Sequence, residues 1–399
     1  MIRTGIWSLL YRCNFSLYPC RIKRMSTDSP SRWRANRIAN STPSVWIEFT
    51  AMAREHNAVN LGQGFPDYPA PDYVTNALAS VAQSSNFGYH QYTRGFGHPR
   101  LVTALGQLYS KLLSREVNGM QHILMTNGAY AALFYSVFGL LNEGDEAIII
   151  EPVYDCYAPM VRMAGGSVVT VPLRLKPKDP DQMTSTDFVL DLSELESKIN
   201  SKTKLLFLNN PNNPLGKVYT RSELEGIAEI CNRHEQLVVV ADEVYEWMIL
   251  NGQMVRFASL PGMWDRTITV GSAGKTFSVT GWKVGWAIAP RPLLECLELV
   301  HQNCSYTMAT PLQEAVALAF ETELARLDSP ECYFNSISPE LQPKLDLLAA
   351  GLREVGLRPV IPEGGYFMIA DYTCLGFKSD PTSKYPKDNQ FVRWLTTQK

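Results

Sequence analysis

The sequence lacks an excess of charge, paired cysteines and long apolar runs. Its 399 residues carry a formal net charge of −2, so electrostatics favour neither nucleic acid nor an anionic membrane as a partner. The eight cysteines form no C-x-x-C pair and have no metal-ligand spacing, which indicates reduced thiols and predicts no metal site. Beyond the first residues, no apolar run is long enough to span a bilayer. The chain is long enough for one large domain or for two.

Two nucleotide-binding motifs are also missing. The stretch GSAGKT, which ends at Thr276, is similar to a phosphate-binding P-loop, whose pattern is G-x-x-x-x-G-K-[ST]. The position five residues before Gly274 is Thr269 rather than glycine, so the wide loop is absent. No G-x-G-x-x-G follows the first strand, which argues against a nicotinamide enzyme. Lys275 therefore needs a function other than nucleotide binding.

The first 25 residues have a composition of their own. They contain five basic residues, and no acidic residue appears before Asp28. Apolar and hydroxyl residues fill the intervals, which is typical of a mitochondrial presequence. We therefore expect residues 1–25 to be a presequence and the protein to be mitochondrial. The alternative is translation from Met25, which would leave the protein in the cytoplasm.

The rest of the chain alternates between helical and strand patterns. Short unbroken apolar runs separated by amphipathic segments predict a mostly parallel sheet with helices on both faces, and so an α/β fold. Residues 61–72 are predicted to be irregular, and residues 176–187 to form a polar surface loop. Helices are expected at 46–56, 130–141, 158–166 and 221–235, and strands at 146–152, 167–173, 204–211, 237–245 and 267–273.

Ligands of such a sheet bind beyond the carboxyl ends of its strands, so the polar residues at these ends carry the information. Four strand ends have unusual residues: Asn127, Gly128 and Ala129 at a helix start, Asn209 and Asn213 in a turn, Asp242 with Tyr245, and Ser272 with Lys275 and Lys283. Each has an ordinary alternative, because an asparagine can simply form a turn, an aspartate can cap a helix, and a lysine can be solvated. Together they supply an anion site, a carboxylate, a phenol, an amide and a lysine.

Pyridoxal 5′-phosphate needs this set of groups. Its aldehyde requires a lysine amine, and its pyridine nitrogen requires a carboxylate that keeps the ring protonated. Its phenolate oxygen requires hydrogen-bond donors, and its phosphate requires amides, hydroxyls and a cation. Burial of Lys275 near Lys283 is expected to lower the pKa of Lys275 and to free the amine for attack.

Several longer stretches resemble the fold-type I aminotransferases. Within them the chain is similar to the kynurenine–oxoglutarate aminotransferases, also called glutamine transaminase K or cysteine-S-conjugate β-lyase. The similarity extends from about Ser44 to the last residue, and it implies transamination between an amino acid and a 2-oxo acid, with β-elimination on cysteine conjugates as a side reaction. The stretches that carry it are VNLGQGFPD, YTRGFGHPRL, GDEAIIIEPVYDCYAPM, NNPNNPLGKVY, DEVYEWM, PGMWDRTITVGSAGKTFSVTGWKVGW and GGYF.

The resemblance implies a role for each matching residue at the cofactor. Lys275 matches the lysine that forms the Schiff base and moves the proton, and Asp242 matches the partner of the pyridine nitrogen. The remaining matches are Asn213 and Tyr245 at the phenolate oxygen, Asn209 beside them, Tyr154 on the ring face, and Gly128, Ala129, Ser272 and Lys283 at the phosphate. Tyr92 matches a tyrosine that reaches the phosphate of a neighbouring subunit, which implies a homodimer with shared active sites.

The substrate side and the domain organisation are implied in the same way. Gly64, Trp46, Asn213 and Tyr306 match positions that line the amino-acid substrate. The resemblance divides the chain into an N-terminal arm with part of the small domain, a large cofactor domain and a smaller α/β domain. The expected bounds are 26–71, 72–300 and 301–399.

The resemblance breaks at the C-terminal end. Relatives continue beyond a segment like FVRWLTTQK with an arginine that pairs with the substrate carboxylate, so we expect an incomplete small domain. Arg393 matches an earlier helix of the family and is expected to be an ordinary surface arginine. Two alternatives follow: a chain that binds the cofactor or dimerises without efficient turnover, and another reaction on the same scaffold, such as aminocyclopropane-carboxylate synthesis or decarboxylation.

Overall fold

The computed structural model describes residues 33–39, 41–179 and 181–398. The expected presequence, residues 1–25, lies outside the described residues. The chain divides into two units, residues 1–40 and 41–399, and the first contains a short 3₁₀ helix at Asn36–Ile38. In the part of the chain that the structure describes, every helix is too short or too polar to cross a membrane.

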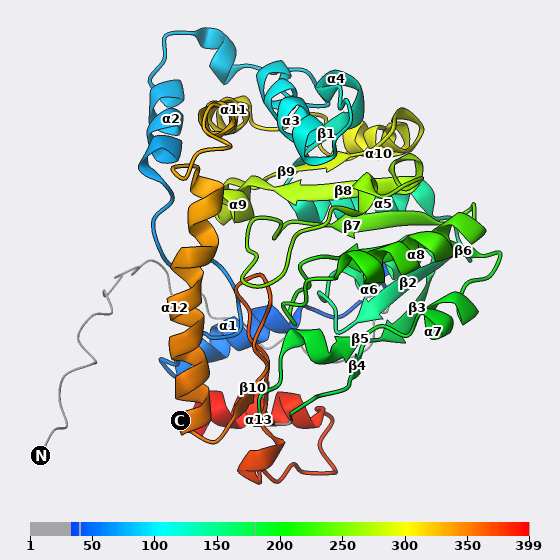
Figure 1. The fold of residues 1–399 in the computed structure, drawn as a ribbon, viewed down its shortest axis with the longest axis vertical. Coiled ribbons are helices and arrows are strands. Elements are labelled where there is room, and N and C mark those ends of the chain that lie inside the picture. The colour runs from blue at the N-terminus through cyan, green and yellow to red at the C-terminus, as the bar shows by residue number, and fades with distance from the viewer. Residues whose placement is uncertain (1–32, 40, 180, 399) are drawn as a thin grey trace, which may run out of the picture. The chain divides into compact units, whose positions relative to one another are not determined.

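The second unit is built around a seven-stranded sheet with the order β1-β9-β8-β7-β6-β2-β3 (Figure 1). Strands β2, β3, β6, β7 and β8 pair in parallel, whereas β9 is antiparallel to both of its neighbours. The prediction of a mostly parallel sheet is therefore confirmed. The strands are β1 (Ile123–Asn127), β2 (Glu146–Glu151), β3 (Ser167–Pro172), β6 (Thr203–Asn209), β7 (Val238–Asp242), β8 (Thr267–Ser272) and β9 (Val284–Ile288).

Helices cover both faces of the sheet. Successive strand residues point to opposite sides, and both sets are apolar here, so each face must be shielded from water. On β6, Leu206 and Leu208 pack in one cluster with residues of α8, whereas Leu205 and Phe207 pack in another with residues of α5 and α6. The helices are α1 (Val45–Glu55), α2 (Asp72–Ala82), α3 (Pro99–Leu112), α4 (Gly119–His122), α5 (Ala129–Leu140), α6 (Tyr157–Met163), α7 (Leu192–Ser197), α8 (Arg221–Arg233), α9 (Ala273–Thr276), α10 (Arg291–Cys304), α11 (Thr310–Leu324), α12 (Tyr333–Glu354) and α13 (Lys387–Gln398).

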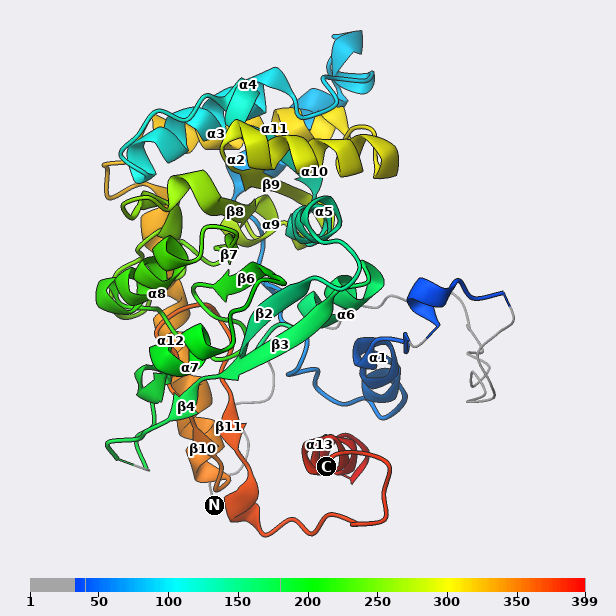
Figure 2. The same ribbon diagram turned by 90° about the vertical axis from the view of Figure 1, so that its right-hand side faces the viewer.

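The C-terminal part, from α12 onward, lies at one end of the second unit, and its last helix, α13, contacts α1. Helix α12 leads away from the sheet to a two-stranded ribbon of β10 (Arg358–Pro359) and β11 (Ala370–Asp371), which is followed by α13. Figure 2 shows α1 and α13 side by side, and they are in contact although they are far apart in sequence. The domain bounds expected from the sequence remain predictions.

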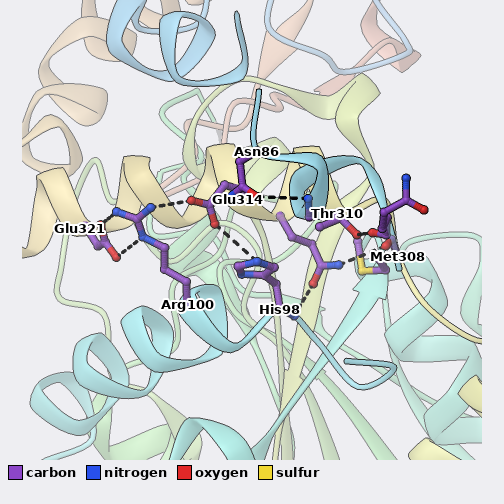
Figure 3. A network of polar contacts seen from close by, with 10 residues as sticks. Asn86, His98, Arg100, Met308, Thr310, Glu314 and Glu321 are labelled. Carbon is purple, nitrogen blue, oxygen red and sulfur yellow. Dashed lines mark hydrogen bonds and ion pairs between the residues drawn. The ribbon is translucent and has the colours of Figure 1, made fainter. Parts of the chain in front are cut away.

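A polar network joins the start of α3 to α11 (Figure 3). Arg100 bridges Glu314 and Glu321 at 2.5 and 2.6 Å, and His98 Nε2 lies 3.5 Å from Glu314. The Thr310 hydroxyl donates to the carbonyl oxygen of Gln91. The network therefore holds both ends of the loop at residues 91–98, which carries one of the predicted site residues.

Candidate active site

A cavity of about 540 Å³ opens at the carboxyl ends of the parallel strands. Asn209, Asp242 and Ser272 are the last residues of β6, β7 and β8, so the strand direction brings them to one place, as predicted. Twelve predicted site residues line this cavity: Trp46, Gly64, Gly128, Ala129, Tyr154, Asn209, Asn213, Asp242, Tyr245, Ser272, Lys275 and Lys283. Segments far apart in the sequence thus meet at one site.

Asp242 is a buried carboxylate with one oxygen in use. The Tyr157 hydroxyl donates a hydrogen bond of 2.6 Å to its Oδ2. Its Oδ1 is buried and has no hydrogen-bond partner among the described residues. Burial raises the pKa of Asp242 to about 6, although the hydrogen bonds from Tyr157 and the Val244 backbone amide and the charge of Lys275 act in the opposite direction. The free Oδ1 is therefore an acceptor for a protonated ring nitrogen in the cavity.

Lys275 lies in the short helix α9, directly after β8. The pKa of its amine is lowered to about 8, mainly by burial; the charge of Asp242 acts against this shift, and the charge of Lys283 adds to it. The predicted direction of this shift is confirmed. A larger fraction of the amine is consequently neutral near physiological pH than for an ordinary lysine. The Nζ atom lies 2.5 Å from the hydroxyl oxygen of Tyr366.

Two asparagines and a tyrosine form the edge of the cavity next to Asp242. The side-chain oxygen of Asn209 accepts from the backbone amide of Asn213 at 2.6 Å, and its nitrogen donates to the Asp242 carbonyl at 2.9 Å. Asn209 therefore braces the turn and the end of β7. The Asn213 amide donates to the Tyr245 hydroxyl at 3.5 Å, so these two predicted partners of one phenolate oxygen do lie together.

The start of α5 provides an anion site beside a lysine. Gly128 caps this 12-residue helix with φ of +74°, which favours glycine. A side-chain carbon at Gly128 would lie 3.0 Å from Lys283 Nζ, and one at Gly285 would lie 2.4 Å from the Ala129 nitrogen. The two glycines thus leave the first amides of the helix open beside the lysine. Free amides, the positive end of the helix and a cation are the groups that bind phosphate.

Tyr92 and Tyr306 lie elsewhere. Neither lines the cavity of its own chain; they are 81% and 63% exposed, and their rings meet edge to face with centroids 5.8 Å apart. Arg393, expected to be a surface arginine, lies on α13, where it pairs with Glu48 at 2.7 Å and stacks on Tyr385. Among the described residues, no arginine lines the cavity.

The structure adds three residues that we did not predict from the sequence. Tyr157 holds Asp242, Tyr366 contacts Lys275, and Asp155 accepts a hydrogen bond of 3.0 Å from the Trp46 indole. All three lie in stretches that carry the family resemblance, EPVYDCY and GGYF. Their presence in those stretches was the available signal, because no local pattern indicates which distant atom each of them meets.

This fold and site define a pyridoxal-phosphate enzyme. The orphaned Asp242 oxygen fits the pyridine nitrogen, and the amides beside Lys283 fit the phosphate. The profile of the family described as aminotransferase class I and II matches residues 56–399. The chain therefore belongs to this family, and it is an aminotransferase with pyridoxal 5′-phosphate as its cofactor.

Individual proteins of known sequence or structure show the same likeness. Kynurenine–oxoglutarate transaminase 3 of Mus musculus is 53% identical over 92% of this chain and 80% of its own length. The crystal structure of Bna3p from Saccharomyces cerevisiae is 32% identical with a TM-score of 0.82, over 92% of this chain and 88% of that one. N-succinyldiaminopimelate aminotransferase of Mycobacterium tuberculosis is 35% identical with a TM-score of 0.81 and the same coverage.

Proposed function

We propose that the protein transfers the amino group of a large neutral amino acid, of the kynurenine, glutamine, aromatic or sulfur-containing kind, to a 2-oxo acid. The name of the mouse relative supports the kynurenine and 2-oxo acid part of this proposal. The observation that carries it is the aromatic lining of the cavity around Lys275, because flat apolar side chains accommodate a large uncharged substrate side chain. The aromatic lining residues are Trp46, Tyr130, Tyr154, Tyr245 and Phe367.

Each residue of the site would have a distinct role in the reaction. Bound pyridoxal phosphate supplies an electron-accepting ring and an aldehyde. Asp242 would hold the ring nitrogen protonated, and Asn213 and Tyr245 would bind the phenolate oxygen. Lys275 would bond to the aldehyde, and after its release its amine would carry a proton between the substrate and the cofactor. The phosphate would lie on the amides of Gly128 and Ala129 with Ser272 and Lys283, and Tyr154 would cover the ring.

Removal of the substrate α-proton would also permit a second reaction, β-elimination. When the substrate carries a good leaving group on its β-carbon, as a cysteine S-conjugate does, the electron pair left by the α-proton would expel that group. We therefore include β-elimination on cysteine conjugates in the proposed activity. Gly64 and Trp46, which line the cavity, would contact the substrate.

The proposal extends to assembly and location. The exposed pair of Tyr92 and Tyr306 suits a second copy of the chain, in which Tyr92 of one subunit would complete the phosphate site of the other and Tyr306 would line its substrate pocket. A symmetric pair would then have two shared sites. The basic leader at residues 1–25 supports a mitochondrial location.

A spectroscopic titration tests the catalytic part. The protein is titrated with pyridoxal phosphate, and we expect the visible band of a lysine-bound cofactor, which kynurenine or glutamine then removes. The rate of band formation should rise through about pH 8 and then level off, because the neutral amine attacks and burial lowers the pKa of Lys275 to about 8. Lys275→Ala should show no such band. A full band in that variant would overturn the assignment.

A further inference from the structure

Lys275 does not lie free in the cavity. Its Nζ lies 2.5 Å from the hydroxyl oxygen of Tyr366, and that hydroxyl lies 3.2 Å from the carbonyl oxygen of Gly64. Tyr366 belongs to the C-terminal GGYF stretch and Gly64 to the N-terminal segment at the cavity mouth. Three atoms from three distant parts of the chain thus form one line of hydrogen bonds.

The direction of these bonds follows from the groups involved. A carbonyl oxygen only accepts, so the single hydroxyl hydrogen of Tyr366 is donated to Gly64. Burial raises the pKa of the Tyr366 phenol, which keeps this hydrogen at working pH. The phenol oxygen then acts only as an acceptor, for Lys275 and for the Tyr245 hydroxyl. An ammonium group donates and never accepts, so this contact favours the charged form of the amine.

The packing around Gly64 requires a glycine for the hydrogen bond between its carbonyl oxygen and Tyr366. A side-chain carbon at this glycine would lie 2.7 Å from Cε2 of Tyr366 and 2.2 Å from Cε1 of Phe367. Only a residue without a side chain lets the carbonyl approach the phenol. The Tyr366 ring is also held edge to face by Tyr245, with centroids 5.5 Å apart.

We propose that Tyr366 is a positioning residue that docks the amine of Lys275 whenever the lysine is not bonded to the cofactor. The phenol then supplies a fixed place for the amine during the part of the cycle in which the substrate occupies the cofactor. It also links the orientation of the amine to the position of Gly64 in the cavity wall. This inference rests on the proposed role of Lys275.

The test measures the pKa of the Lys275 amine in the cofactor-free protein. Chemical acetylation over a pH series, with mass spectrometry of the peptide that carries Lys275, gives the fraction of neutral amine. Tyr366→Phe should lower this pKa by about one unit, because it removes one acceptor for the charged form. Tyr372→Phe is the control. It also removes a tyrosine hydroxyl, but the Tyr372 ring stacks on Phe391 and does not line the cavity, so the pKa of Lys275 should be unchanged.

Two further measurements keep the result decisive. If Tyr366→Phe fails to fold, 3-fluorotyrosine at position 366 weakens the acceptor without a change of shape, and a smaller downward shift is expected. An unchanged or raised pKa in either protein overturns the inference. Borohydride reduction of the wild-type protein with bound cofactor distinguishes failure of this inference from failure of the proposed function, because it fixes the cofactor to the lysine that holds it. Cofactor attached to a residue other than Lys275 refutes the proposed function. Cofactor attached to Lys275, together with an unchanged pKa in the Tyr366 variants, refutes only the role of Tyr366.

Discussion

At the scale of single residues, the buried carboxylate of Asp242 serves the proposed function but lowers the stability of the folded protein. Burial raises its pKa from 3.8 to about 6. Above pH 6 the carboxylate is ionised in both the folded and the unfolded chain, so the full cost of burying the charge lowers stability. Below pH 3.8 it is protonated in both states and the cost disappears. Without bound cofactor, the folded protein is therefore less stable at neutral pH than a variant with an uncharged side chain at this position.

Asp242→Asn should accordingly stabilise the cofactor-free protein. We expect the free energy of unfolding to rise by about 2 to 3 kcal/mol at pH 8 and by about half of that at pH 5, because the amide carries no charge but still accepts from Tyr157. Urea unfolding at the two pH values measures the difference. Asp67→Asn, at an exposed carboxylate, should change neither value. A variant that is less stable than the wild type at pH 8 would contradict the argument.

Much of the cofactor site could be predicted from the sequence, but the residues that support it could not. Asp242 and Lys275 could be found because each follows an apolar strand and parallel strands end at one edge. Tyr157 and Tyr366 meet these residues across 85 and 91 positions of the chain. A contact of that separation depends on the packed structure, and a tyrosine in a family motif does not reveal its partner.

At the scale of elements, the contact between α1 and α13 rests on Arg393. Its guanidinium donates to Glu48 of α1, stacks on Tyr385 at 3.8 Å and also bonds Asn389. Glu48 is half exposed, so the ion pair contributes little by itself, and the stacking adds a comparable amount. The contact supports the packing of two helices and lies outside the cavity.

Arg393→Ala should therefore lower stability without a change at the site. We expect a loss of about 1 kcal/mol in the free energy of unfolding and an unchanged affinity for pyridoxal phosphate. Arg54→Ala, at an exposed position of the partner helix α1, should cost less than about 0.5 kcal/mol. Unfolding curves and a cofactor titration of both variants give the comparison. A loss of amino-acid binding at unchanged stability would instead assign Arg393 to the substrate.

The predicted elements succeeded where one apolar run forms one buried strand. Strands β2, β3, β6 and β8 and helices α1, α5 and α8 lie within two residues of the expected bounds, whereas β7 ends three residues before its expected end. Strand β9 was not predicted, and its antiparallel direction depends on the connection rather than on its composition. Residues 176–187 were only partly a surface loop, because Met183, Ser185 and Asp187 are buried. There a capping box and packing against the C-terminal part outweigh polar composition.

At the scale of the whole molecule, the exposure of Tyr92 supports the proposed homodimer. The network around Arg100 and Glu314 holds its loop in a defined place, yet the tyrosine itself is 81% exposed and outside its own cavity. Such a side chain contributes little to the stability of one chain. Its position makes sense if a second copy provides the surface that covers it.

Mixing two inactive variants tests this arrangement. Tyr92→Ala should lack the residue that the partner needs, and Lys275→Ala should lack its own lysine. In a hybrid dimer, the site that keeps its lysine also receives an intact Tyr92 from the other chain. Random exchange of subunits should then restore about a quarter of the wild-type sites, measured as transaminase activity.

The matched control mixes Lys275→Ala with Asp242→Ala. Both residues line the cavity of the same chain, so each site of the hybrid lacks one of them and no activity should return. Sedimentation of each mixture shows whether dimers form and exchange. Exchange without recovery in the first mixture would mean that Tyr92 does not act across the subunits. Recovery in both mixtures would mean that Lys275 and Asp242 come from different chains, which the single-chain cavity does not allow.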